Sequence, residues 1–207
     1  NLTLDEELNK KVIRFCYNNS YLSYYSRMIN KDRIPFSLNN ERYNTYDFVT
    51  EFYKHKEIYF WIKIDDFSAS YGIVRLLTLS SSNEDIFKIT IDADCNVTFN
   101  CLGTKEVLGK IKPNEWSLIG LSLKKINDNE TSLIYVLNDQ VKNETDEINE
   151  ELKEIKKITF GPNTNSTLEN SIPYSILFAG IGIYDHDKVS YNNIYYDGKR
   201  FINNNNS

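Results

Sequence analysis

Three side chains in the middle of the chain have the spacing of a calcium-binding loop. Asp92, Asp94 and Asn96 form a D-x-D-x-N run, and oxygen ligands at alternating positions begin the EF-hand loop. That loop also requires glycine at its sixth position and glutamate at its twelfth, where this sequence has Val97 and Gly103. We therefore interpret the run as the acidic turn of a β-hairpin and predict no calcium site.

Zinc chemistry and serine-hydrolase chemistry would both depend on histidine, which is rare in this chain. His55 and His186 are far apart in the sequence, and no cysteine pair has the ligand spacing of a zinc site. Neither histidine lies near a G-x-S-x-G nucleophile motif. His186 stands between two aspartates, which is typical of a solvated turn. The sequence therefore predicts no metal ion and no cofactor.

Glycoside hydrolysis would need two carboxyl groups about 5–10 Å apart on a sheet face. No predicted strand has an E-x-D pattern, and Asp65 and Asp66 are adjacent, so their side chains belong to opposite faces of a strand. Gly180 and Gly182 lie within an apolar strand, which indicates a bulge or a close backbone approach rather than a phosphate-binding loop. We therefore expect that the protein is not an enzyme.

Composition limits the class of partner. The chain has 207 residues and a net charge of −5 without a basic block, and this charge has the wrong sign for a surface that follows phosphates. We therefore do not expect the protein to bind nucleic acid. A length of this order favours one domain. The 15 tyrosines and 11 phenylalanines favour strands over helices.

The cysteines indicate the redox compartment. The chain has three cysteines, Cys16, Cys95 and Cys101, without regular spacing. An odd number favours free thiols in a reducing compartment. A Cys95–Cys101 disulfide is the alternative. No secretory signal and no apolar run of about 18 residues is visible. We expect a cytoplasmic location. Because the chain begins with Asn1, we also expect it to be one part of a longer protein.

Apolar residues alternate with period two in much of the chain from Ile34 onward, which predicts strands. Short strands joined by polar turns are typical of an antiparallel sandwich, so we predict a mostly β, two-sheet antiparallel sandwich. The predicted strands are residues 57–64, 73–79, 86–91, 97–99, 107–108, 115–124, 132–137, 158–161 and 176–184. The predicted buried residues are Phe60, Ile62, Leu77, Ile89, Leu121, Ile134, Phe160 and Ile181.

Helices are expected only around this sandwich. Residues 1–33 are predicted to be a helical segment packed on it, because Thr3 and Glu6 form a capping box ahead of an apolar stripe with helical spacing: Leu4, Leu8, Val12 and Phe15. The sandwich itself is assigned to residues 34–202. Residues 203–207 are expected to be disordered because they have no apolar side chain.

The densely charged residues 144–157 allow two interpretations. Ile148, Leu152 and Ile155 have helical spacing, and Glu150 with Lys153 forms an i,i+3 pair. We expect a short surface helix against the sandwich, and an acidic docking arm for a basic partner is the alternative.

Five segments in the same order resemble the concanavalin A-like/laminin-G superfamily. They are FWI at residues 60–62, NEWSLI at 114–119, YVLND at 135–139, ITFG at 158–161 and FAGIGIY at 178–184. The resemblance covers roughly residues 34–201. It implies a concanavalin A-like jelly roll with short peripheral helices, one of them over residues 187–195, after the last strand.

Two further segments resemble the concanavalin A-like domain of BEACH-family scaffold proteins. They are DDF at residues 65–67, followed by VRLLTL at 74–79, and IYYDGKRF at 194–201, where Asp197 and Lys199 depart from the family pattern. This resemblance implies a non-catalytic scaffold module of a large cytoplasmic protein in vesicle trafficking and protein sorting. Membrane association would then be indirect, at vesicle surfaces and through the parent protein.

Two alternatives remain open. The F-W-I-x-I strand and the Asn- and Tyr-rich composition are also similar to the lectin-like receptor-binding domain of secreted clostridial neurotoxins. A secreted glycan-binding lectin is the other alternative, although no calcium loop of the legume type is visible.

Surface aromatic residues are the expected partner contacts, since tyrosine and tryptophan are favoured at binding hot spots. Tyr21, Tyr24 and Tyr25 form the candidate cluster. The expected partner is another protein or a neighbouring domain of the same chain, and a glycan is left open.

Overall fold

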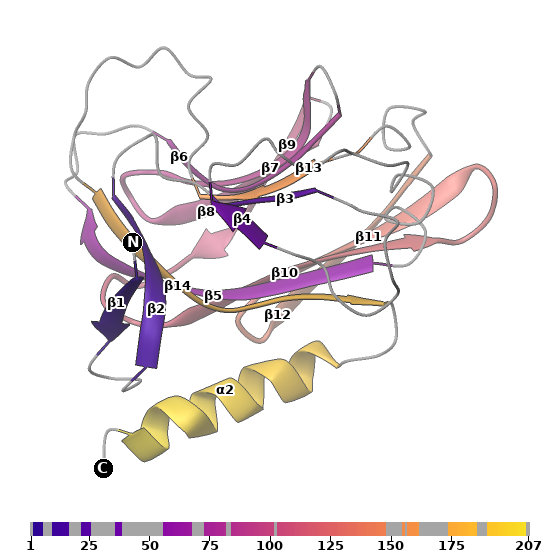
Figure 1. The fold of residues 1–207 in the computed structure, drawn as a ribbon. Helices are drawn as coiled ribbons and strands as arrows, with labels where there is room; N and C mark the ends of the chain where they lie inside the picture. Colours follow the sequence, from indigo (N-terminus) through magenta and orange to yellow (C-terminus); the bar gives the residue numbers. More distant parts are fainter. Residues whose placement is uncertain are drawn as a thin grey trace.

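Alternating apolar residues assemble into two antiparallel sheets that pack face to face (Figure 1). The computed structural model describes residues 2–5, 10–16, 22–25, 36–38, 56–67, 73–81, 84–101, 103–147, 155, 157–161, 174–185 and 190–205. Each sheet has seven strands within these ranges. The predicted fold class, a mostly β two-sheet sandwich of the jelly-roll type, is confirmed.

The order of strands in space differs from their order in the chain. Sheet A contains β1 (Leu2–Asp5), β2 (Lys10–Cys16), β14 (Tyr174–Asp185), β5 (Lys56–Phe67), β10 (Ser117–Lys125), β11 (Glu130–Leu137) and β12 (Gln140–Glu147). Sheet B contains β4 (Phe36–Leu38), β3 (Leu22–Tyr25), β13 (Lys157–Phe160), β6 (Val74–Ser80), β7 (Asp85–Ile91), β8 (Asn96–Cys101) and β9 (Thr104–Lys110). The predicted hairpin of β10 and β11 is confirmed, with Leu121 opposite Tyr135.

The main core lies between the two sheets. Phe60 stacks on Phe178 at a centroid distance of 5.4 Å and meets the edge of Phe160 from sheet B at 5.5 Å. The prediction of burial is confirmed for Phe60, Ile62, Leu77, Ile89, Leu121 and Phe160. Ile181 is only partly buried against this core. Ile134 is half-buried, because its neighbours Leu133 and Tyr135 take the inward positions of β11.

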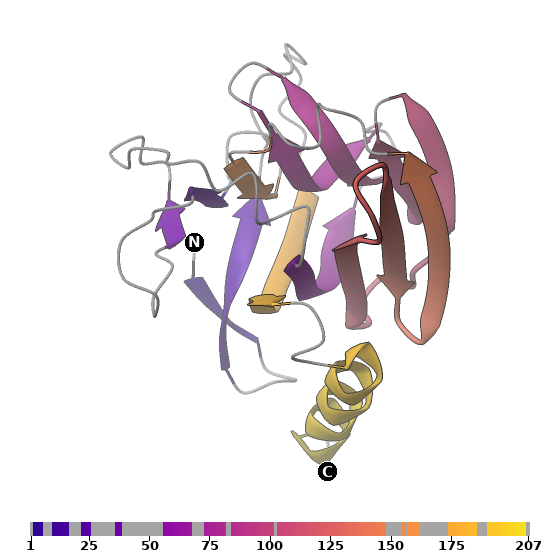
Figure 2. The ribbon, with the colours of Figure 1, turned by 90° about the vertical axis from the view of Figure 1, so that its right-hand side faces the viewer.

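Helix α2 (Tyr191–Asn205) covers the outer face of sheet A, away from sheet B (Figures 1 and 2). Trp61 stacks on Tyr195 with ring centroids 6.0 Å apart, and Ile202 is buried in the same apolar cluster. Lys199 Nζ donates to the backbone oxygen of Trp116. A Cβ atom on Gly198 would lie 2.3 Å from the Trp61 ring, so glycine permits this close packing. Burial raises the pKa of the Tyr195 phenol.

A helix follows the last strand, as predicted, but its residue bounds differ from the prediction. The helix begins at Tyr191, beyond most of the predicted 187–195, and continues to Asn205. Residues 203–205 were expected to be disordered, yet they form the last turn of the helix. The buried Ile202 packs against sheet A and supplies the tertiary contact that composition alone does not show. Within the described part of the chain, no helix is both long and apolar enough to span a bilayer.

The predicted N-terminal helix within residues 1–33 is wrong where the structure describes it. Leu2–Asp5 and Lys10–Cys16 pair as antiparallel strands, with Thr3 opposite Val12. A lone helix of this length is marginal in water, whereas β14 offers four residues of β2 backbone ladder partners, such as Ile176 opposite Phe15. Asp5 is buried and forms an ion pair with Lys63 at 2.5 Å.

Two other expectations are corrected. Residues 144–147, assigned to a surface helix, form the end of β12, and residues 148–154 lie outside the described residues. Cys95 directly precedes β8 and Cys101 ends it, and no disulfide joins the two. A strand of six residues is about 20 Å long, so a disulfide between them is excluded. The predicted bulge at Gly180 and Gly182 is confirmed by a register shift between Ala179 and Gly182.

Candidate ligand-binding face

The outer face of sheet B is polar. Leu77, Phe87, Ile89 and Phe99 point into the core, so the alternating positions of the same strands belong to the opposite face. Arg75 and Asp85 are brought to that face by register shifts, which place them opposite Thr90 and Ser80. We call this surface the sheet B outer face, and define it by Arg75, Thr78 and Ser80 of β6, Asp85, Lys88 and Thr90 of β7, Thr98 and Asn100 of β8, Lys105 and Val107 of β9, and Lys157 and Thr159 of β13.

Charge on this face is opposite in sign to that of the whole chain. The defined set contains the cations Arg75, Lys88, Lys105 and Lys157 and one carboxylate, that of Asp85. The chain as a whole carries a net charge of −5. Most of the acidic side chains are therefore elsewhere, and this face is suited to an anionic ligand.

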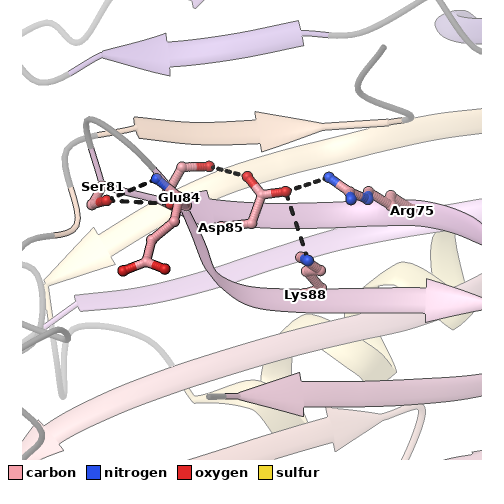
Figure 3. Close-up of polar contacts among 6 residues, drawn as sticks. Arg75, Ser81, Glu84, Asp85 and Lys88 are labelled. Atoms are coloured by element: carbon pink, nitrogen blue, oxygen red, sulfur yellow. Dashed lines mark hydrogen bonds and ion pairs between the residues drawn. The ribbon is translucent and has the colours of Figure 1, made fainter. Parts of the chain in front are cut away.

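Arg75, Asp85 and Lys88 form the centre of this surface (Figure 3). Arg75 Nη1 donates to Asp85 Oδ2 at 2.5 Å, and Lys88 Nζ lies 3.7 Å from the same oxygen. Ser80 Oγ donates to Asp85 Oδ1 at 2.9 Å. The side chains of Arg75, Asp85 and Lys88 are 23%, 21% and 31% exposed, so a solute can reach all three.

Local backbone irregularities position this cluster. The pairing of β6 with β7 shifts register between Arg75 and Leu77, and again between Leu79 and Ser80. Directly before Asp85, the Ser81 amide donates to the Glu84 carbonyl and Ser81 Oγ accepts from the Glu84 amide (Figure 3). Bulges re-aim side chains at the ends of strands. Together these features bring Asp85 beside Arg75.

Exposure increases across the face from β6 to β9. Thr78 and Thr159 are fully buried, Lys88 and Asn100 are half-buried, and Lys105 is exposed. Within the described residues, the Thr78 hydroxyl has no hydrogen-bond partner. A ligand would therefore approach the face over β7, β8 and β9, with the Arg75 cluster at its more enclosed end.

A second polar group lies on the face of sheet A that α2 covers. Glu57 Oε1 accepts from Ser122 Oγ at 3.2 Å. Burial raises the pKa of Tyr59, and the neighbouring charge of Glu57 raises it further. Glu57 and Tyr59 are nearly inaccessible to solvent, so this group is closed to a ligand while α2 is in place.

The D-x-D-x-N run forms the turn between β7 and β8, which confirms its interpretation as a hairpin turn. Asp92 Oδ1 accepts from the amides of Asp94 and Asn96 at 3.0 and 2.9 Å and also from Asn96 Nδ2. Cys95 follows with a positive φ of 63°. The hydrogen bond from the Asn96 side chain lowers the pKa of Asp92 below its ordinary value of 3.8. Among the described residues, no group of three or more His, Cys, Asp or Glu side chains could hold a metal ion.

Replacing Asp92 with alanine is expected to lower the free energy of unfolding by about 1 kcal/mol at neutral pH, because the turn loses its acceptor. The folded-state pKa is depressed, so the stabilisation is present above pH 3.8 and is lost as the pH falls through the folded-state value. Urea unfolding at neutral pH and at about pH 2 measures both effects. Asp94→Ala is the control, since Asp94 contributes its backbone amide to this turn; an equal loss in both variants would contradict the assignment.

The tyrosines predicted to bind a partner are placed only in part. Tyr21 lies outside the described residues. In β3, Tyr24 is opposite Ile158 and Tyr25 is opposite Lys157, so successive positions belong to opposite faces of sheet B. The position of Tyr25 lies on the same face as the Arg75 cluster, in a cross-strand row that continues through Lys157 and Ser80 to Asp85, whereas the position of Tyr24 belongs to the opposite face. Their role as partner contacts remains a prediction.

Sequence reasoning missed the sheet B outer face. Its signal was the polar residue at every second position of otherwise apolar strands, as in Lys88 and Thr90 of β7 and Thr98 and Asn100 of β8. Each residue alone is an ordinary solvent-facing side chain. The cluster emerges only when the register places Thr78 opposite Lys88 and Ser80 opposite Asp85.

No family model and no curated protein sequence matches the chain. Solved structures do match its fold. The binding domain of botulinum neurotoxin DC, in complex with rat synaptotagmin II, is 13% identical with a TM-score of 0.52 over 97% of this chain and 51% of that chain. Alginate lyase A1-II', of polysaccharide lyase family 7, is 10% identical with a TM-score of 0.56 over 89% and 83%. Trypanosoma rangeli sialidase in complex with sialic acid is 12% identical with a TM-score of 0.53 over 73% and 23%.

These neighbours are β-sandwiches of the jelly-roll type, which agrees with the predicted concanavalin A-like fold. The chain spans about half the length of the botulinum binding domain and about a quarter of the sialidase chain. At such low identity the likeness establishes the fold alone. None of the three is a BEACH protein, so the BEACH resemblance gains no support from them.

The expectation that the protein is not an enzyme is corrected by the same comparisons, since a lyase and a sialidase share its fold. That expectation rested on the lack of an E-x-D pattern within one strand. In a sandwich, side chains from different strands and loops meet on one face through register, as Arg75 and Asp85 do here. A pattern within a single strand is therefore a poor test for catalysis.

Proposed function

We propose that the chain is a binding module whose sheet B outer face recognises a glycan that carries carboxylate groups. The observation that carries this proposal is the excess of cations on that face, in a chain whose net charge is −5. Near Lys88 stand the hydroxyl of Thr90 and the amide of Asn100, both partly exposed, which are groups that can hydrogen-bond to sugar hydroxyls.

The chemistry of the cluster suits a sugar acid. The Arg75 guanidinium has a planar fork of donors that matches a carboxylate, and Lys88 adds a mobile point charge beside it. The face is polar and partly open, as glycan sites need to be. It extends over four strands, β6 to β9, which at 4.7–4.9 Å per strand spacing gives about 14 Å between the outer strands.

The names of the structural neighbours guide the choice of ligand. One study of botulinum neurotoxin type C, similar at a TM-score of 0.52, concerns two ganglioside molecules. The sialidase structure contains sialic acid, and the lyase acts on alginate. These statements belong to those proteins. They support testing carbohydrates first, before proteins.

Titration calorimetry with sialyllactose, an alginate oligosaccharide and neutral lactose tests the proposal. The acidic ligands are expected to bind, and Lys88→Ala is expected to weaken them about tenfold or more, since a hydrogen bond to a charged group contributes about 1.5–3 kcal/mol. Lys124→Ala is the matched control, because Lys124 is an exposed lysine on sheet A. Equal binding of lactose, or equal loss in both variants, would refute the proposal.

A scaffold role in a BEACH-type protein is a separate hypothesis that rests on the sequence resemblance alone. It carries with it the expected protein partner, the cytoplasmic location and the role in vesicle trafficking and protein sorting. Deleting residues 34–201 from a parent protein and following cargo sorting tests it. A protein that binds the isolated domain through Tyr24 and Tyr25, with no glycan bound, would favour this hypothesis over the glycan-binding one.

A further inference from the structure

The Arg75 cluster has one carboxylate for two cations. Arg75 Nη1 makes a close hydrogen bond to Asp85 Oδ2, while Lys88 Nζ lies 3.7 Å from that oxygen, outside hydrogen-bond range. Within the described residues, the Lys88 ammonium makes no hydrogen bond that competes for its three donors. The cluster is therefore already built as a carboxylate receptor. Its second cation, Lys88, can still donate hydrogen bonds to a ligand.

The carboxylate that fills this receptor can be given up at low cost. Arg75, Asp85 and Lys88 are each between a fifth and a third exposed, and ion pairs with this degree of solvent access contribute little to stability. A carboxylate from solution that took the place of Asp85 would keep the charge-assisted hydrogen bond of Arg75. Exchange of one carboxylate for another leaves neither cation unpaired.

Asp85 also has an alternative partner within reach. Ser80 Oγ donates to Asp85 Oδ1 at 2.9 Å, which is the oxygen that faces away from the two cations. Asp85 follows the hydrogen-bonded Ser81 and Glu84 and borders a register shift between β6 and β7 (Figure 3). The side chain can therefore release Arg75 while it keeps its hydrogen bond to Ser80.

We propose that Asp85 is a built-in competitor, a specificity-determining residue whose carboxylate occupies the Arg75–Lys88 receptor until the carboxylate of a sugar acid replaces it. This inference rests on the proposed glycan-binding function, and it identifies the carboxylate of the ligand as the group that the site recognises. A neutral sugar cannot displace Asp85, because it would leave the Arg75 guanidinium without an anionic partner. Asp85 thus gives the site its selectivity, because acidic sugars can displace it from Arg75 and neutral sugars cannot.

Asp85→Asn tests the competitor role, because asparagine keeps the shape and the Ser80 contact but removes the charge. The expected result is an affinity for sialyllactose raised about twofold to fivefold, the size expected for release of a partly exposed ion pair. Lactose binding should remain unchanged. In the double variant Asp85→Asn/Lys88→Ala, the gain in affinity for sialyllactose should be smaller, since Arg75 is then the one cation left in the cluster.

The outcomes separate this inference from the proposed function. If the wild-type protein binds sialyllactose and Asp85→Asn binds it no better, or more weakly, the competitor role is refuted while glycan binding stands. If Asp85→Asn weakens acidic and neutral sugars alike, Asp85 accepts hydrogen bonds from the ligand instead. If neither protein binds an acidic sugar and both unfold at the same urea concentration as each other, the proposed function itself has failed.

Discussion

Replacing Phe60 with alanine is expected to lower the free energy of unfolding by about 3–5 kcal/mol. The Phe60 ring is fully buried and contacts Phe178 of its own sheet and Phe160 of the opposite sheet. The variant would leave a cavity at the point where the two sheets meet. Since a domain of this kind is stabilised by only about 5–15 kcal/mol, urea unfolding should show a large fall in the midpoint.

Phe201→Ala is the matched control for this experiment. Phe201 is the same residue type but is 38% exposed on α2, so its loss is expected to change stability by about 0.5 kcal/mol or less. Comparable destabilisation by the two variants would show that Phe60 is not at the centre of the core.

Gly198→Val is expected to lower the free energy of unfolding by about 1–3 kcal/mol through overpacking. A Cβ atom at this position would lie 2.3 Å from the Trp61 ring, which is buried and stacked on Tyr195. The ring cannot move away without breaking that stack. Helix α2 should therefore separate from sheet A, and trypsin should cleave faster after Lys199 and Arg200.

Asp197→Val is the control for the helix itself. Asp197 is 65% exposed and pairs with Arg200 on the solvent side of α2, so valine there changes helix propensity without touching Trp61. If both variants accelerate cleavage equally, the effect belongs to helix propensity and the close approach at Gly198 has no special role.

The sequence predicts the sandwich well because its strongest signals are local. Residues 57–64 have Ile58, Phe60, Ile62 and Ile64 at every second position, so β5 could be assigned with this buried face. The burial of Tyr59 and Trp61 on its other face was not predicted, because it depends on α2. Ile134 shows the limit of the same reasoning. Residues 132–137 are nearly all apolar, so alternation does not reveal which face is inward, and only packing between the sheets decides for Leu133 and Tyr135.

The N-terminal strands and the candidate site could not be predicted for a different reason. Leu2–Asp5 and Lys10–Cys16 are strands because β14 is available as a partner, and that partner is remote in sequence. Arg75, Asp85 and Lys88 meet because two register shifts occur in the pairing of β6 with β7. Neither the pairing partner nor the register shifts can be recognised from the local sequence. Both can be identified only in the folded structure.

The place of β14 in sheet A has a consequence for how the protein is made. Its neighbours are β2 from near the beginning of the chain and β5, and Ser175 pairs with both Cys16 and Asp66. During synthesis β2 can pair with β1, but it must wait for β14 to emerge before it can join the rest of sheet A, although β6 to β9 can already form successive hairpins. Contacts that close so long a loop slow folding and prolong exposure of unpaired strand edges. We therefore expect the N-terminal strands to join sheet A late, after β14 has been made.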